Sequence, residues 1–327
     1  MIELTLILFH FFLLFILFLF PITPHLNNHY LGKYNFDIYN IFFFNIVINL
    51  NIYLIISIFI KNIQLLFLIN IGLAILFLLY NLKKNILYFK LNNWKLLLLF
   101  FLVNISIFIS VAENPKLNWD GAVVWLPKAS TYFQGLGFTD VGAHTYPHLG
   151  GFLWGYFWKN SFSQLEYIGR FFYIFFYVLS IFSLINFLQV YKKLKFPILL
   201  MFIFFILSIT YDRFLFGGYQ DTLLFSLLII ISNILYLIKV KNYKNLFTYF
   251  LYFMGAFICC WIKQEGLIYF LILSFILIFY EKKTKIIIYH SITSILLLSI
   301  YFLLKYHLIG EVQFDQKIDL KIFNLFE

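Results

Sequence analysis

The residues able to do chemistry in this sequence of 327 residues are concentrated between Glu113 and Glu166. This polar segment holds four of the six tryptophans, three of the six prolines and seven of the 15 glycines. Its first motif, Asn-Trp-Asp-Gly, places Asp120 directly after Trp119. A carboxylate within reach of a hydroxyl group can act as a general base, and Asp120 is the candidate for that role. The alternative is structural, because aspartate is also a common helix cap.

A short helix is expected over residues 122–133, carrying Trp125 and Lys128. At about 100° per residue, Lys128 lies roughly 80° around from Asp120, which predicts that both face one cavity. Lys128 is therefore a candidate site residue. The alternative is that it extends to the water above a membrane surface.

A second short helix is expected after His144 and Tyr146, with Trp154 and Trp158 on one face. Both helices are predicted to be amphipathic and to lie at a membrane surface. His144 and Tyr146 are candidate substrate contacts. The alternatives are that His144 only hydrogen-bonds within the loop and that the aromatic residues form an interfacial belt.

Two further polar connections repeat this chemistry: residues 211–221 hold Arg213 and Asp221, and residues 263–266 hold Lys263 and Glu265. Ionisable groups at the depth of a membrane are costly and therefore tend to be functional. The only two arginines are Arg170 and Arg213, and arginine is suited to bidentate phosphate binding. The set suits an anionic lipid head group joined to a sugar.

The composition excludes a soluble protein. Hydrophobic residues make up 63% of the chain and charged residues 12%, with a mean hydropathy of +0.91, whereas soluble domains are about 25% charged. The net charge of +10 comes from lysines in short clusters between apolar runs, a pattern that indicates membrane topology and not nucleic-acid binding. Cys259 and Cys260 are adjacent in an apolar run, so we expect packing residues there, without a disulfide or a metal site.

About ten apolar runs have a length that suits a membrane helix. They cover residues 4–20, 41–60, 63–80, 96–112, 167–190, 197–210, 222–238, 246–262, 267–280 and 286–304. Cytoplasmic connections carry the excess of lysine and arginine, which assigns the connections 113–166, 211–221 and 263–266 to the outer side. The same alternation leaves the N-terminus outside, so one of the first four runs is expected to be re-entrant or not a span.

The predicted fold is therefore an all-α polytopic membrane protein. Residues 1–112 form N-terminal membrane helices, 113–166 the outer loop with the active site, 167–304 the membrane helices of the core, and 305–327 a tail. Membrane lipids are expected partners of the chain.

The sequence resembles the GT-C superfamily of membrane glycosyltransferases, which includes protein O-mannosyltransferases and lipid A aminoarabinose transferases. The bacterial pattern W-D, W-x-x-K-A and H-x-x-Y-P-x-L is matched by Trp119-Asp120, Trp125 to Ala129, and His144 to Leu149, with one residue fewer between the histidine and the tyrosine. Later features are matched by Gly218-Tyr219-Gln220-Asp221, Lys263-Gln264-Glu265-Gly266 and Arg170. The likeness covers residues 113–280. More spans precede the first loop here than in many members, and members usually continue beyond the point where this chain ends, which favours a truncated or compact form.

The resemblance implies a polyprenyl-phosphate-sugar donor, a glycan, lipid or protein acceptor, and an inverting single displacement with Asp120 as catalytic base. It implies a site facing the outside of a bacterial inner (plasma) membrane. Asp221 would orient the acceptor or a cation, and a divalent cation is left open. Candidate phosphate contacts are Lys128, Arg170, Arg213 and Lys263; further substrate contacts are Trp119, Trp125, His144, Tyr146 and Glu265.

Two other classes of function remain open. A transporter or flippase of a lipid-linked sugar or other anion would need broken helices at the midplane and usually an internal repeat, and the charges here cluster at one face. A non-catalytic assembly subunit would fit a short chain. No nucleic-acid partner is expected.

Overall fold

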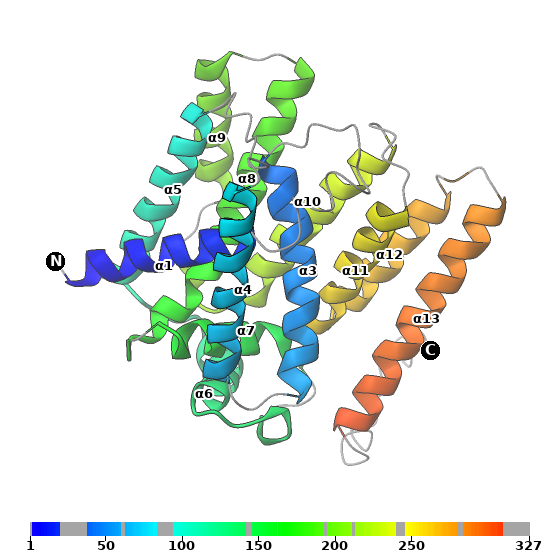
Figure 1. Ribbon diagram of the computed structural model, residues 1–327, viewed down its shortest axis with the longest axis horizontal. Coiled ribbons are helices and arrows are strands. Elements are labelled where there is room, and N and C mark those ends of the chain that lie inside the picture. The colour runs from blue at the N-terminus through cyan, green and yellow to red at the C-terminus, as the bar shows by residue number, and fades with distance from the viewer. Residues whose placement is uncertain are drawn as a thin grey trace, which may run out of the picture.

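The part of the chain that the structure describes is mainly helical, and no strand occurs there (Figure 1). The computed structural model describes residues 2–19, 38–59, 63–83, 94–141, 146–161, 163–192, 195–210, 213–239, 246–279, 281 and 284–309. The apolar helices are α1 (Ile2–Leu19), α3 (Ile38–Phe59), α4 (Ile63–Lys83), α5 (Trp94–Glu113), α8 (Phe171–Lys192), α9 (Phe196–Thr210), α10 (Gln220–Lys239), α11 (Leu246–Ile262), α12 (Gly266–Phe279) and α13 (Thr284–Ile309). Between α5 and α8 lie η1 (Gly121–Trp125), α6 (Leu126–Phe133), η2 (Phe138–Asp140), α7 (Leu149–Lys159) and η3 (Glu166–Arg170), and η4 (Arg213–Phe216) precedes α10.

An apolar helix lies on each of the ten predicted runs, and five helices are long and apolar enough to cross a membrane. Their candidate spans are Phe42–Phe59, Lys95–Glu113, Glu166–Leu184, Gln220–Lys239 and Thr284–Tyr306. The other five apolar stretches are shorter, for example Pro197–Ile209 and Gly266–Phe279. The protein is therefore a helical membrane protein, while the count of ten spans is not confirmed.

The first helix differs from the others in direction. In Figure 1, α1 runs horizontally, whereas α3, α4 and α5 run between the upper and the lower side of the picture. The helix itself, Ile2–Leu19, is 18 residues long, which lies within the range of about 17–25 residues for a membrane helix. The expectation that one of the first four runs is re-entrant or not a span stays a prediction.

The core is built around α8, which is buried at every position from Phe171 to Ser183. It packs against α5, α9 and α10, and also against α1 and α3. Aromatic contacts fill the junctions; the rings of Phe108 and Phe171, for example, stack at 4.2 Å. A helix that is apolar on all sides suits such a central place.

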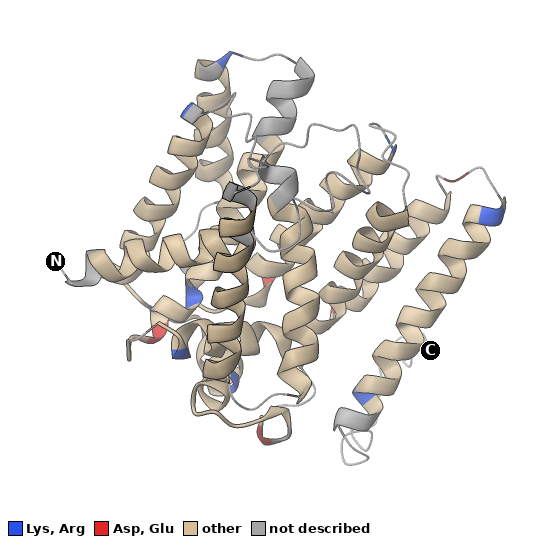
Figure 2. Cartoon of the chain, viewed as in Figure 1, with Lys and Arg blue, Asp and Glu red and all other residues tan. Residues whose placement is uncertain are grey.

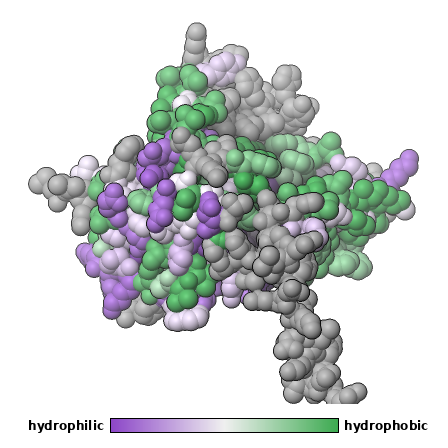
Figure 3. Space-filling view, turned by 90° about the horizontal axis from the view of Figure 1, so that it is seen from below, coloured by the Kyte–Doolittle hydropathy of each residue, from purple (hydrophilic) through white to green (hydrophobic). Residues whose placement is uncertain are grey.

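The connecting segment between α5 and α8 lies at one end of the bundle. Helices α5, α9 and α13 begin on the upper side of Figure 1, whereas α6 and α7 lie on the lower side. Figure 2 shows few charges along the bodies of the long helices, and Figure 3 shows hydrophilic residues gathered over part of the lower face. The polar segment predicted to hold the site thus lies at one end of the molecule.

The prediction of two amphipathic surface helices is wrong for the second of them. The segment of η1 and α6 has two faces: Val123 is 54% exposed, whereas Lys128 and Tyr132 are each 1% exposed. Helix α7 is instead buried at every position from Leu149 to Phe157. Its glycines explain this, because a Cβ at Gly155 would collide with the carbonyl oxygen of Ala129. Only glycine lets α6 approach α7 so closely, and burial of α7 follows.

Candidate active site

Asp120 lies in the first turn of the helix that continues into η1 and α6. Its backbone is helical (φ −59°, ψ −39°), and its side chain makes no capping hydrogen bond. The helix begins instead at Asn118, whose carbonyl oxygen accepts the N–H of Ala122 at 2.8 Å. The interpretation of Asp120 as a helix cap is therefore wrong. Its position in the first turn still suits a negative charge, since the positive end of the helix dipole lies there.

The carboxylate of Asp120 is partly exposed, and it has no hydrogen-bond or ion-pair partner within the described ranges. Next to it, Trp119 is 72% exposed. An accessible carboxylate that no cation neutralises is able to accept a proton from a bound hydroxyl group.

A π-helical turn, η1, separates Asp120 from Lys128. Because a π-turn closes i to i+5 hydrogen bonds, the count of 100° per residue does not hold across it. Lys128 is on the buried side, where its Nζ donates to the carbonyl oxygens of Tyr146 (2.7 Å) and Pro147 (3.4 Å). The prediction that Asp120 and Lys128 face one cavity is not supported, since the ammonium group is directed to the chain at residues 146–147.

Two aromatic rings complete the environment of Lys128. Its Nζ lies 5.4 Å from the ring centroid of Trp125 and 6.0 Å from that of Tyr146. Trp125 is 3% exposed and holds the lysine, so it is a packing residue and not an open stacking surface. Tyr146 is 40% exposed and remains accessible.

Burial lowers the pKa of Lys128 to about 7, below its value of about 10.4 in an unfolded chain. Between these values the unfolded state binds more protons, so the free energy of unfolding should rise with pH, by up to about 1.4 kcal/mol per pH unit. The nearby His148 stays neutral in this range, because burial and then the charge of Lys128 lower its pKa to about 3. Thermal unfolding in detergent at several pH values should show this rise in the wild type and not in Lys128→Met.

The exposed Lys116 in the same segment supplies the control, because its ammonium group is solvated in both states. Lys116→Met should keep the wild-type slope. An unchanged slope in Lys128→Met would show that Lys128 is charged in the folded protein at neutral pH.

Glycines join the first polar connection to the second. The N–H of Asn118 donates to the carbonyl oxygen of Gly217 at 3.0 Å, and a Cβ on Gly121 would overlap that same carbonyl group. Gly218 has φ +98° and lies against the ring of Trp154, a conformation that a side chain would strain. The segment that carries Asp120 therefore packs against the turn at residues 217–218, which leads to Asp221.

An ion pair joins the second connection to the third. Lys263 Nζ lies 2.6 Å from Asp221 Oδ1 and 3.5 Å from Glu265 Oε1. The two carboxylates are 58% and 54% exposed and the lysine 22%. Partial burial lowers the pKa of Lys263, but the hydrogen bond and charge of Asp221, with Glu265, outweigh it and raise the pKa. The cluster has a net negative charge, which suits a hydroxyl-rich acceptor or a cation better than a phosphate.

The predicted phosphate contact at Arg170 is not supported. Arg170 is fully buried, and its guanidinium group donates to the carbonyl oxygens of Pro115 (2.9 Å), Lys116 (3.2 Å) and Phe216 (2.7 Å). Its Nε also lies 2.9 Å from Glu166 Oε1. A sequence cannot show that a guanidinium group will be consumed by backbone carbonyls from two distant segments.

The structure does not describe two of the predicted site residues in full. Residue His144 is outside the described residues, and Arg213 is described only through its backbone in η4. Among the described residues, no group of three or more His, Cys, Asp or Glu is arranged to hold a metal ion.

Asn118 is the residue that the sequence reasoning missed. It starts the helix of Asp120 and contacts Gly217 through its backbone N–H. The signal was present, since asparagine is a preferred residue at a helix start.

No family model, curated protein or solved structure matches this chain.

Proposed function

We propose that this protein is a membrane glycosyltransferase that moves a sugar from a polyprenyl-phosphate donor to an acceptor hydroxyl, with Asp120 as the general base. The acceptor oxygen forms a bond to the sugar C1 as its proton passes to the Asp120 carboxylate. The bond from C1 to the phosphate oxygen breaks on the opposite face, so the configuration inverts and the polyprenyl phosphate leaves as an anion.

The observation that carries the proposal is the state of Asp120. Its carboxylate is accessible and not neutralised by any described cation, and its helix packs through Asn118 and Gly121 against the turn at Gly217. A base must be both reactive and fixed in place to work. The net negative cluster of Asp221, Lys263 and Glu265 follows the same turn and supplies acceptors for the hydroxyl groups of a sugar.

Of the four candidate phosphate contacts, the three whose side chains the structure describes already have partners within the protein. Lys128 and Arg170 donate to backbone carbonyls inside the protein, and Lys263 is paired with Asp221. Arg213 stands in η4, directly before the turn at residues 217–218, and its guanidinium group suits bidentate phosphate binding. We therefore propose Arg213 for this role.

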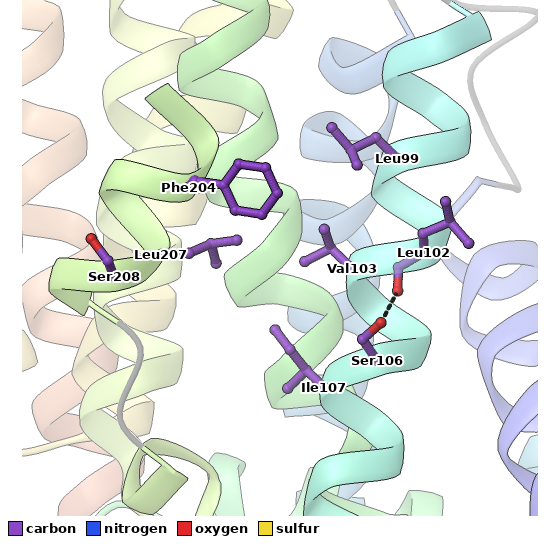
Figure 4. Close-up of a pocket in the computed structure, with 8 residues that line it drawn as sticks. All are labelled: Leu99, Leu102, Val103, Ser106, Ile107, Phe204, Leu207 and Ser208. Atoms are coloured by element: carbon purple, nitrogen blue, oxygen red, sulfur yellow. Dashed lines mark hydrogen bonds between the residues drawn. The ribbon is translucent and has the colours of Figure 1, made fainter. Parts of the chain in front are cut away.

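An apolar groove between α5 and α9 offers a place for a hydrocarbon chain (Figure 4). Its volume is about 520 Å³, and it is lined by Leu99, Leu102, Val103, Ser106, Ile107, Phe204, Leu207 and Ser208. The two serine hydroxyl groups donate to carbonyls of their own helices, Leu102 and Phe205. With only hydrocarbon presented to a ligand, the groove suits a membrane lipid or the tail of a polyprenyl donor.

The test is to incubate membranes containing the protein with a panel of radiolabelled polyprenyl-phosphate sugars. We expect label to move into a glycan, lipid or protein fraction, and not in membranes that lack the chain. If the labelled lipid-linked sugar instead crosses the vesicle membrane and no sugar is transferred to an acceptor, the transporter is favoured. Activity that appears only with a second copurified chain would favour an assembly subunit.

We also propose that the protein lies in a bacterial inner membrane, with the connections 113–166, 211–221 and 263–266 facing outside. A cysteine placed at the exposed Gln264 should react in intact cells with an impermeant thiol reagent, and one at the exposed Lys195 should not. The native Cys259 and Cys260 are buried and contribute little background. Labelling at position 195 alone would invert the assignment.

A further inference from the structure

Arg170 stands at the junction of the two segments that carry the candidate carboxylates. Pro115 and Lys116 belong to the connection that leads into the helix of Asp120, and Phe216 precedes the glycine turn that leads to Asp221. One buried guanidinium group donates to a carbonyl oxygen of each of these three residues. It therefore joins two parts of the chain that are far apart in the sequence.

The arginine is itself held from two sides. Glu166, one turn earlier in the chain, contacts Nε at 2.9 Å and a terminal nitrogen at 3.4 Å. The guanidinium carbon lies 5.8 Å from the ring centroid of Trp154, and that same ring contacts Gly218. A planar group fixed in this way presents its donors in one geometry.

We propose that Arg170 is a positioning residue, which sets the placement of the Asp120 helix relative to the turn before Asp221. The inference rests on the proposed function for its catalytic consequence, but the joining of the two segments can be measured without any activity. Lysine cannot replace arginine here, because one ammonium group cannot reproduce a planar fork that reaches three carbonyls at once.

The first arm of the test is hydrogen exchange of the full-length protein in detergent. Arg170→Lys should speed exchange about tenfold or more in both residues 114–122 and residues 213–219, the factor expected from losing one hydrogen bond to a charged group. Exchange in the turn at residues 263–268 should not change. Tyr252→Phe is the matched control, since it removes another buried hydrogen bond to a backbone carbonyl, that of Leu273, and should leave both segments protected.

The second arm uses turnover with a donor from the panel. Arg170→Lys should lower kcat and leave the KM for the donor unchanged, because the residue does not touch the phosphate. A raised KM with normal kcat would overturn the proposal and restore the phosphate contact. Unchanged exchange in both segments would overturn it as well.

Two provisions keep the test decisive. If Arg170→Lys does not fold, Glu166→Gln takes its place, because it loosens the guanidinium group without removing it, and the same two segments should exchange faster. If the wild-type protein transfers no sugar, the proposed function fails while the exchange arm still decides the role of Arg170.

Discussion

Asp120→Asn should reduce sugar transfer about 10²- to 10⁴-fold, the range expected for losing a general base. The amide cannot accept the proton of the acceptor hydroxyl, while its size and shape remain close to those of the carboxylate. Because Asp120 makes no capping hydrogen bond, the fold loses only a favourable dipole interaction, worth about 0.3–1 kcal/mol. Initial rates with a donor from the panel, together with thermal unfolding of the same sample, measure both effects.

Asp140→Asn is the control for this substitution. Asp140 is exposed in the same loop, and its Oδ2 accepts the backbone N–H of Gly137 at 2.9 Å. An asparagine oxygen can accept the same bond, so activity and stability should both be nearly unchanged.

Retention of more than about a tenth of the activity in Asp120→Asn would lie well outside the range for a general base. Asp221 or Glu265 would then be the next candidate. Both carboxylates are more than half exposed, and each lies near Lys263.

Gly121→Ala should destabilise the protein by about 3 kcal/mol, the upper end of the range for overpacking. The added methyl group would overlap the carbonyl of Gly217 and approach Gly218 Cα. These are backbone atoms and cannot rotate away as a side chain can. Relief requires moving the Gly217 carbonyl, which also accepts the N–H of Asn118. Activity should fall with stability, because Asp120 is the adjacent residue.

Gly72→Ala separates this clash from the general effect of adding a methyl group to a helical glycine. Gly72 lies in α4 with nothing within 4 Å of an added Cβ. Alanine should therefore stabilise the protein by about 0.5–1 kcal/mol, because the unfolded chain has less conformational freedom with alanine than with glycine. Thermal unfolding of both variants in one detergent compares them, and similar effects in the two would show that the contact between Gly121 and Gly217 is loose.

The convergence of the polar connections was predictable from the sequence, but the partners within the site were not. Alternating lysine-rich loops placed residues 113–166, 211–221 and 263–266 on one side, and the contacts at Gly217 and Lys263 bring their described parts together. The detailed angular argument for Asp120 and Lys128 was wrong, because a π-turn intervenes. Such a turn arises from local packing and has no simple sequence signature.

The sequence by itself determined the class of protein and the positions of the ten long apolar runs on which the structure describes a helix, because long apolar runs leave the chain no other way to satisfy its backbone in a membrane. It also indicated Asp120 as the residue to examine. Only the tertiary structure decided that Arg170 and Lys128 bind backbone carbonyls, that α7 is buried and that α1 crosses the other helices. The physical reason is that a charged side chain in an apolar interior takes whichever polar partner the fold brings near, and that partner can be more than 40 residues away, as Phe216 is from Arg170.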